Sequence, residues 1–391
     1  MGMIKFYLTH PYFMGYVCLS LFSAFMFARF AGMKKGQIIM PVLAMLISIA
    51  AWYFRLIRPE IFDSNSAAQE IVIFISYSWL GCMLMASISA VVCFIVFSIL
   101  KISKTSIIPN AEKYMPFGAF VVLAVYAFYN GMRQPPVVEI EIKSDQVSDE
   151  LDGYRIVQLS DIHLDSKNKM KRFIKTMERV NSLNADIVLL TGDMIDLGVD
   201  ESSSADGYFN VLKANDGVYA CMGNHEAYFE KNARESRKRT VPLLKRMGLE
   251  LLYDESKHYK SIELPKFYLT GLADIGSERL KAEKISSKIG NGKKKKPEIV
   301  MSHQPMYYKE IAEKHPMLVL SGHTHGGQIF PFSLYWRRRY KYFYGHFVIK
   351  DTHFYVSRGA GVYGPIMRFL APSEVPVLTL RKLETEKHEQ K

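Results

Sequence analysis

The stretch VLSGHTHGGQIF, Val319 to Phe330, places His323 and His325 one residue apart between glycines, directly after an apolar run. Imidazole nitrogens bind divalent metal ions and also exchange protons near neutral pH. A strand points successive side chains to opposite faces, but a turn beginning at Gly322 can direct residues i and i+2 toward one point. The spacing therefore fits a shared ligand, although it also fits a polar turn whose histidines bond only to backbone.

Residues of metal-binding type follow five short apolar runs in the same way. The motifs are SDIHLD after Arg155 to Leu159, GDMID after Ile187 to Thr191, GNHEA after Val218 to Met222, HQP after Glu298 to Ser302 and GHTHGG after Met317 to Ser321. Five of the ten histidines beyond residue 133 stand in these motifs. Ligands of open α/β sheets gather at the carboxyl ends of strands, so we expect the five loops to converge on one crevice.

The donor types in these motifs indicate which metal ions would bind. Carboxylate, amide and imidazole groups together suit manganese, iron or zinc better than calcium, which prefers oxygen ligands. Two such ions about 3.5 to 4 Å apart can hold both the attacking and the leaving oxygen of a phosphoryl centre. Two ions need a bridging ligand, and Asp193 follows a glycine that permits close backbone approach. The motifs thus predict a dinuclear site with Asp193 between the ions.

The elements that must position these motifs lie in residues 134 to 391, where apolar strands alternate with helical patterns and predict an α/β domain. Pro135 and Pro136 end the preceding apolar run, and an alternating strand follows them in VVEIEIKSD. Further strands are expected at Phe267 to Gly271, His353 to Ser357 and Val375 to Leu380, and helices at Lys169 to Leu183, Arg237 to Met247 and Tyr307 to Lys314.

Residues 1 to 133 hold four apolar runs that are almost free of charge: Tyr12 to Phe30, Ile38 to Phe54, Ile71 to Leu100 and Met115 to Tyr129. A membrane-spanning helix needs about 20 apolar residues. We therefore predict a multi-pass membrane domain of about four transmembrane helices. The third run is interpreted as one long helix rather than two segments that turn near Gly81. The first run is too long, and too closely followed by another, for a cleaved signal peptide.

Four spans place the amino terminus and the carboxy-terminal domain on the same side of the cell membrane. Six basic residues lie near the spans on the opposite side and four on this side, so the positive-inside rule favours an extracytoplasmic catalytic domain. Residues 134 to 391 hold 40 Lys and Arg against 34 Asp and Glu, and a +6 surface on a tethered domain favours anionic headgroups or phosphorylated substrates without requiring either. The sequence contains no recognised nucleic-acid-binding motif, so we expect no nucleic-acid partner. Cys221 is the only cysteine beyond residue 133, which excludes an internal disulfide in that region.

The ordered set D-x-H, G-D-x-x-D, G-N-H-E, H and G-H-T-H resembles the calcineurin-like metallophosphoesterase superfamily over about residues 150 to 381. The GHTHGGQI form and the ending SRGAGVYGPIMRFLAPSEVPVLTL are most similar to its membrane-associated bacterial branch. The resemblance implies a four-layer α/β-β/α sandwich, in which two central mixed sheets are flanked by helices. It also implies a metal-dependent hydrolase that uses two divalent ions.

Carried over residue by residue, the family pattern places three side chains on each ion and a carboxylate between them. The first set is Asp161, His163 and His325, the second is Asn224, His303 and His323, and the bridge is Asp193. The pattern also makes His225, oriented by Asp196, an acid that protonates the leaving oxygen or stabilises the transition state. A hydroxide that bridges the ions would attack phosphorus in line.

These features predict a membrane-anchored phosphoesterase that hydrolyses phosphodiester or pyrophosphate bonds of lipid-linked substrates. The alternatives are a broad phosphomonoesterase and a non-catalytic membrane sensor that binds a phosphorylated ligand. The basic and aromatic stretch Ser333 to Phe347 fits a headgroup clamp at a membrane, or equally an exposed hairpin with paired rings. Arg358 and Arg368 fit either a phosphate site or a structural salt bridge to Glu374.

Overall fold

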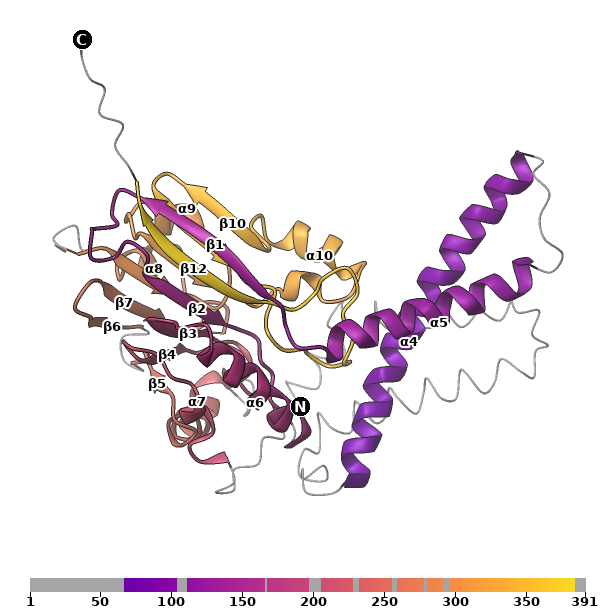
Figure 1. Cartoon of the computed structure of the whole chain (residues 1–391), viewed down its shortest axis with the longest axis horizontal. Coiled ribbons are helices and arrows are strands. Elements are labelled where there is room, and N and C mark those ends of the chain that lie inside the picture. Colours follow the sequence, from indigo (N-terminus) through magenta and orange to yellow (C-terminus); the bar gives the residue numbers. More distant parts are fainter. Residues whose placement is uncertain are drawn as a thin grey trace, which may run out of the picture. The chain divides into compact units, whose positions relative to one another are not determined.

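The computed structural model describes residues 67–103, 111–165, 167–196, 205–227, 232–254, 259–277, 280–290 and 296–383. The chain divides into two compact units (Figure 1). One unit comprises Met1–Arg133 together with Tyr363–Phe369, and the other comprises Gln134–Val362 together with Leu370–Lys391.

The second unit contains two six-stranded mixed sheets, with strand orders β1-β12-β2-β3-β4-β5 and β10-β11-β9-β8-β7-β6. In the first sheet, β2 to β5 run parallel, and β12 pairs antiparallel with β2. In the second sheet, β7, β8, β9 and β11 run parallel between the antiparallel edge strands β6 and β10. The strands are β1 (Val137–Ser144), β2 (Arg155–Leu159), β3 (Ile187–Thr191), β4 (Val218–Cys221), β5 (Glu250–Leu251), β6 (Tyr259–Glu263), β7 (Tyr268–Leu272), β8 (Glu298–Met301), β9 (Leu318–Ser321), β10 (Gly345–Ile349), β11 (Thr352–Val356) and β12 (Val375–Lys382).

Three hydrophobic clusters show that helices cover the outer face of each sheet. Successive strand residues point to opposite faces. Val188 of β3 accordingly packs in a cluster with Met177 of α6, whereas Leu189 packs with Leu320 of β9 between the sheets. On the far face of the second sheet, Val319 shares a cluster with Ile311 of α9. The order is therefore helix, sheet, sheet, helix. The helices are α6 (Lys167–Asn181), α7 (Ala233–Arg246), α8 (Ala282–Ser286), α9 (Tyr308–Ala312) and α10 (Phe332–Arg339).

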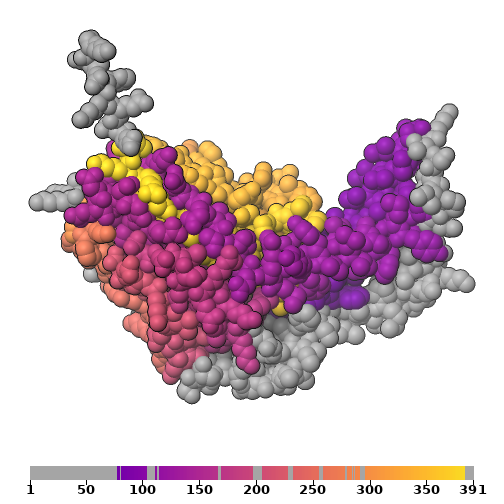
Figure 2. Space-filling model, viewed as in Figure 1, coloured from indigo at the N-terminus to yellow at the C-terminus, as the bar shows by residue number. Residues whose placement is uncertain are grey.

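The last strand completes the first sheet beside the first strand. Leu378 of β12 lies opposite Ile140 of β1 in a parallel pair and opposite Ile156 of β2 in an antiparallel pair. Figure 2 shows the magenta start and the yellow end of this unit on one surface. The first sheet is therefore built from both the first and the last strand of this unit. The alternating strand predicted after Pro136 is β1.

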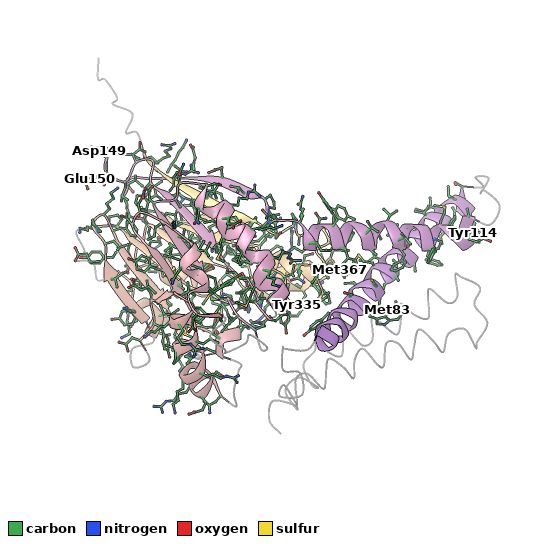
Figure 3. The ribbon with its side chains drawn as sticks, turned by 60° about the horizontal axis from the view of Figure 1, so that its bottom comes forward. Met83, Tyr114, Asp149, Glu150, Tyr335 and Met367 are labelled. Atoms are coloured by element: carbon green, nitrogen blue, oxygen red, sulfur yellow. The ribbon has the colours of Figure 1, made fainter. Side chains whose placement is uncertain are left out.

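Two long apolar helices belong to the first unit: α4 (Ala67–Ile102) and α5 (Ala111–Met132). Met83 lies on α4 and Tyr114 on α5 (Figure 3). The third apolar run forms one continuous helix, as predicted. Within the described residues, Tyr77–Ile102 and Tyr114–Met132 are the two helical stretches long and apolar enough to cross a membrane. The first two predicted spans lie at 12–30 and 38–54, outside the described residues.

Main-chain contacts join Tyr363–Phe369 to these helices. The backbone N–H of Arg368 donates to the carbonyl of Ala127 at 2.9 Å. A Cβ atom on Gly131 would lie 2.6 Å from the backbone of Ile366, so a glycine is needed for this close approach. Tyr363–Phe369, which lie between β11 and β12 in the chain, thus pack within the helical unit.

The nine strands predicted for residues 134 to 391 are all present, with small shifts at their ends. The prediction omitted β5, β6 and β10, and also the short helices α8 and α10. The hairpin interpretation of Ser333 to Phe347 is wrong for its first half, where the chain forms α10. Its second half does contain β10, which pairs antiparallel with β11.

Candidate metal centre

The loops that follow β2, β3, β4, β8 and β9 bring the predicted site residues together. Within the described residues, three groups of side chains have donor atoms within 4.8 Å of one another. They are Asp161 with His163 and His325, His163 with Asp193 and His225, and Asp193 with His303 and His323. His163 and Asp193 each belong to two groups. The three groups therefore form one continuous site.

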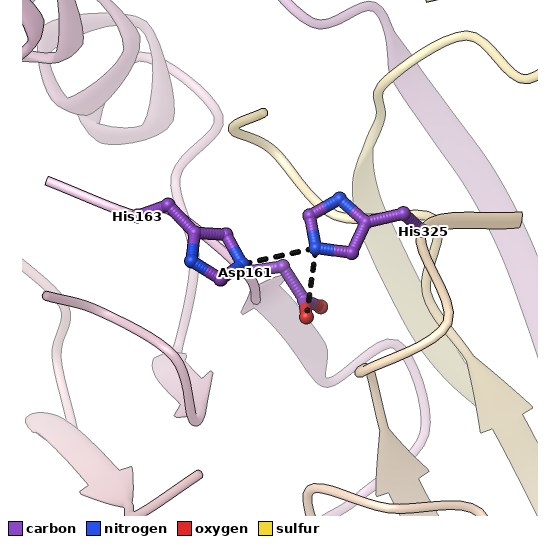
Figure 4. Close-up of side chains that lie close together, drawn as sticks. All are labelled: Asp161, His163 and His325. Atoms are coloured by element: carbon purple, nitrogen blue, oxygen red, sulfur yellow. Dashed lines mark hydrogen bonds and ion pairs between the residues drawn. The ribbon is translucent and has the colours of Figure 1, made fainter. Parts of the chain in front are cut away.

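The first group lies at the ends of β2 and β9 (Figure 4). Nε2 of His163 lies 3.0 Å from Nε2 of His325, which lies 3.4 Å from Oδ1 of Asp161. The other ring nitrogen of His163, Nδ1, lies 3.1 Å from both carboxylate oxygens of Asp196. Because a carboxylate accepts hydrogen bonds, Asp196 favours the proton on Nδ1 and leaves the Nε2 lone pair available. Buried lone pairs that converge in this way suit a cation.

The second group is Asp193, His303 and His323, at the ends of β3, β8 and β9. Asn224, at the end of β4, lies beside it. Nδ1 of His303 lies 2.7 Å from the Thr191 carbonyl, which can only accept, so the proton is on Nδ1. In the neutral imidazole Nε2 of His303 then carries the lone pair, and it lies 3.1 Å from Oδ1 of Asn224 and 3.0 Å from Oδ2 of Asp193. Burial alone would lower the pKa of His303, but the carboxylates of Asp193 and Asp161 raise it to about 10, so either a proton on Nε2 or a bound cation balances these oxygens. The donor set therefore fits a metal ion here as well.

Asp193 connects the group of Asp161, His163 and His325 to His303 and His323. Its Oδ2 is 3.0 Å from Nε2 of His303 and 3.8 Å from Nε2 of His163. Burial alone would raise the pKa of Asp193, but His303 and His225 hold it well below its usual range. A Cβ on Gly223 would lie 2.2 Å from Asp193 Oδ1, so only glycine permits this approach. An anionic oxygen thus occupies the position that a bridging ligand requires.

Backbone strain is concentrated at the same residues. Asp161, His163, Asp193, His323 and His325 have φ values between 51° and 73°, in the left-handed region. This conformation costs about 1 to 3 kcal/mol at a residue other than glycine. Each of these residues follows the end of a strand, where the turn directs its side chain toward the shared site. Five of the seven candidate ligands therefore have a backbone conformation that is unfavourable by itself and is held by the surrounding fold.

His225 is partly exposed and pairs with Asp196. Its Nδ1 lies 2.5 Å from Oδ1 of Asp196, and its side chain is 19% exposed. Burial alone would lower the pKa of His225, but the carboxylates of Asp193 and Asp196 raise it to about 9. The grouping of His225 with His163 and Asp193 would also allow it to act as a ligand. Its predicted function as an acid stays a prediction.

Glu226 is a positioning residue to which the sequence analysis assigned no function, although it stands in the GNHEA motif. Its fully buried carboxylate accepts four backbone N–H bonds: from Met194 and Ile195 at Oε1 (2.7 and 3.2 Å), and from Asp193 and Gly223 at Oε2 (3.1 and 2.7 Å). These donors belong to the loops after β3 and β4. One side chain therefore fixes both loops that supply the candidate bridge and Asn224.

We expect Glu226→Gln to destabilise the second unit, because the amide NH₂ group cannot accept the two N–H bonds that one carboxylate oxygen accepts. Each buried N–H left without an acceptor lowers the free energy of unfolding by about 1 to 3 kcal/mol. Thermal unfolding of the detergent-solubilised protein would measure the change. The matched control is Glu235→Gln on α7, where the exposed carboxylate pairs only with Lys238 in the described contacts. Equal unfolding temperatures for the two variants would contradict the positioning function.

The two arginines near the glycine-rich turn have different surroundings. Nη2 of Arg358 lies 2.6 Å from Oε2 of Glu374, and its Nε lies 2.7 Å from the same oxygen. The structural salt bridge is therefore the interpretation that the geometry supports for Arg358. Arg368 is fully buried within the helical unit.

Known proteins provide an independent comparison. Residues 154–327 match the family described as Calcineurin-like phosphoesterase. A protein of Helicobacter pylori (strain ATCC 700392 / 26695) named "Uncharacterized metallophosphoesterase" is 32% identical over 278 residues, which is 69% of this chain and 71% of that protein. A Danio rerio protein named "Transmembrane protein with metallophosphoesterase domain" is 31% identical over 270 residues, which is 67% of this chain and 61% of that protein. A solved Danio rerio "dimetal phosphatase" covers 57% of this chain and 91% of its own, with 10% identity and a TM-score of 0.36.

Two mixed sheets, with buried histidine and aspartate clusters at the carboxyl ends of their strands, define a metal-dependent hydrolase. The chain belongs to the calcineurin-like metallophosphoesterase family, as the sequence motifs predict. It is therefore a metal-dependent phosphoesterase, and its relatives include bacterial and animal proteins.

Proposed function

We propose that the chain is a membrane-anchored phosphoesterase with two divalent metal ions, which cleaves phosphodiester or pyrophosphate bonds of lipid-linked substrates. The observation that carries the dinuclear site is the continuous set of donor groups in which His163 joins Asp161 and His325 to Asp193, and Asp193 joins them to His303 and His323; five of the ligand residues have left-handed backbone. The first ion would be held by Asp161, His163 and His325, and the second by Asn224, His303 and His323. The mixture of nitrogen and oxygen donors favours manganese, zinc or iron.

Bound divalent ions would supply Lewis-acid activation of water and neutralise charge on the phosphoryl oxygens. The protein itself supplies orientation and proton transfer. Asp196 orients His225 through Nδ1, and Nε2 lies 3.9 Å from Oδ2 of Asp193. A proton on Nε2 could then pass to the leaving oxygen as its bond to phosphorus breaks. Asp196 also contacts His163, so one carboxylate aligns a candidate ligand and the candidate acid.

Two features support a lipid-linked substrate. The helices α4 and α5 are apolar enough to cross a membrane, which would keep the enzyme in the compartment where lipid headgroups occur. The α10 helix carries three consecutive arginines and three aromatic residues in the segment that follows the GHTH motif. Guanidinium groups bind phosphate oxygens well. The complete set of candidate ligands favours this enzyme over a sensor that only binds phosphate.

The test is hydrolysis by the purified, metal-reconstituted full-length protein of phosphomonoesters and phosphodiesters, each with and without acyl chains. Faster turnover of acylated diesters or pyrophosphates is the expected result. A strong preference for short, soluble monoesters would instead identify a broad phosphomonoesterase. Loss of activity after chelation, and its return with manganese or zinc, would establish the metal requirement.

We also propose an extracytoplasmic catalytic domain, on the basis of the charges that flank the apolar runs. Glu150→Cys places a thiol at an exposed position of the second unit (Figure 3). This variant should react with a membrane-impermeant thiol reagent in intact cells. The unmodified chain is the control, because Cys221 of the same unit is buried. Labelling only after the membrane is opened would place the domain in the cytoplasm.

A further inference from the structure

Among the described residues of the candidate metal centre, two histidines have partly exposed side chains. Asp161, His163, Asp193, Asn224, His303 and His325 are all at most 7% exposed. His225 and His323 are the two members of the site that remain partly exposed. A substrate phosphate must therefore approach past these two rings, and side chains that contact them border its path.

Two aromatic residues of the α10 region contact His323. The ring centroid of His323 lies 5.3 Å from that of Trp336 and 5.6 Å from that of Tyr340, both in edge-to-face geometry. Trp336 and Tyr340 stack on each other at 5.5 Å, with 24° between their planes. Together they form an aromatic pair beside the partly exposed His323.

Tyr340 fixes the position of this pair. It is buried, and its hydroxyl donates to Oε1 of Gln304 at 3.1 Å. Gln304 in turn donates to Asp274 at 3.0 Å. This chain of bonds begins one residue after His303, so the aromatic pair is tied to the loop that supplies a candidate ligand. Trp336 stacks on this fixed ring and is only half-buried.

The surroundings of Trp336 do not suggest that it serves as a core residue. Every residue of α10 is at least partly exposed, so the helix contributes no buried side chain to the core. Arg337, Arg338 and Arg339 are all exposed, and Arg337 and Arg339 lie over the rings of Phe343 and Tyr340 at 5.2 and 5.5 Å. The helix therefore presents a large apolar ring and positive charge next to the phosphate site. This combination suits an amphiphilic anion.

We propose that Trp336 determines substrate specificity: it contacts the apolar group esterified to the phosphorus atom while the phosphate lies at the metal centre. The substrate class is a phosphodiester that carries an alkyl or acyl chain. The inference rests on the proposed phosphoesterase function and adds the element that distinguishes lipid-like from small esters. Tyr340 acts through Trp336, as the ring on which the indole stacks.

The test uses 4-nitrophenyl alkyl phosphodiesters with methyl, butyl and octyl groups, below their micelle concentrations, with the full-length protein in detergent. In each reaction water adds to phosphorus, the bond to the nitrophenolate oxygen breaks, and an alkyl phosphate remains. The leaving group is constant, so differences in kcat/KM report contacts to the alkyl group. For the unmodified protein, kcat/KM should rise with chain length, because burial of each methylene is favourable.

Trp336→Ala should lower kcat/KM for the octyl ester about 10- to 100-fold, the range typical of a lost apolar contact in a pocket, and change the methyl ester less than about twofold. Trp336→Phe, which keeps a ring against His323 and Tyr340, should retain most of the preference. Leu334→Ala is the matched control, because Leu334 is a 53% exposed apolar residue of the same helix. This variant should keep the rise with chain length.

Metal content measured by elemental analysis separates specificity from damage to the site. If Trp336→Ala holds its metal ions and slows all three esters equally, or if the unmodified protein shows no rise with chain length, the specificity assignment is overturned while phosphoesterase activity stands. If the metal-loaded protein hydrolyses none of the esters, the proposed function and the specificity assignment are both overturned.

Discussion

Asp193→Ala should abolish turnover and release at least one of the two metal ions. Oδ2 of Asp193 lies within 4 Å of histidine nitrogens from both groups, 3.0 Å from His303 and 3.8 Å from His163. Alanine removes the shared anionic oxygen and leaves two clusters of lone pairs without the negative charge that would balance two dications. We expect activity to fall to the background rate and the metal content to fall from two ions to one or none.

Elemental analysis and phosphodiester hydrolysis on the same preparation would check this expectation. The matched control is Asp206→Ala, which removes an exposed carboxylate that pairs with Arg246 at 3.2 Å on the surface of the same unit. Surface pairs of this kind contribute little to stability, so the control should keep both ions and full activity. Two tightly bound ions in Asp193→Ala would contradict the bridging assignment.

The strands that carry the site could be predicted because their sequences are apolar on both faces. β3 is IVLLT and β9 is LVLS, and every residue of both is buried between a helical layer and the other sheet. The omitted strands lack this signal. β10, GHFVI, is an edge strand in which His346 and Val348 are exposed, so it is not buried on both faces, and it pairs antiparallel with β11.

The helix α10 escaped prediction for a related reason. Its sequence, FSLYWRRR, has aromatic and basic residues without an apolar stripe at helical spacing, and it buries no residue. Trp336 stacks on Tyr340, four residues further on, which places both rings on one side of the helix end. That contact, together with the contact to His323, depends on the fold and could not be deduced from local periodicity.

The identity of the site residues could be predicted, whereas their geometry could not. The motifs indicate that Asp161 and His163 approach His325, because strand ends converge. They do not indicate that these residues adopt left-handed backbone, since Asp and His rarely do so without tertiary constraint. The four N–H bonds that Glu226 accepts supply part of this constraint at Asp193, and they join two loops far apart in the sequence.

His225→Ala should keep both metal ions and lower kcat by about 10² to 10⁴, the usual contribution of a general acid. The expectation follows from the partners of His225: its Nδ1 is engaged by Asp196, and Nε2 lies 3.9 Å from Oδ2 of Asp193. His303 and His323 are expected to differ, because a ligand holds charge in the ground state. Truncation of either ligand should therefore lower metal occupancy as well as rate.

The leaving group provides the decisive comparison for His225. A nitrophenolate departs without a proton, so His225→Ala should slow a nitrophenyl ester only slightly, whereas an alkyl ester that expels an alkoxide should lose the full factor. The matched control is His315→Ala, which removes an exposed histidine that also pairs with an aspartate, Asp351, at 2.8 Å. This control should leave both rates unchanged. If His225→Ala loses a metal ion, or slows good and poor leaving groups equally, then His225 is a ligand or a binding residue, because only a proton donor makes the loss depend on the basicity of the oxygen that leaves.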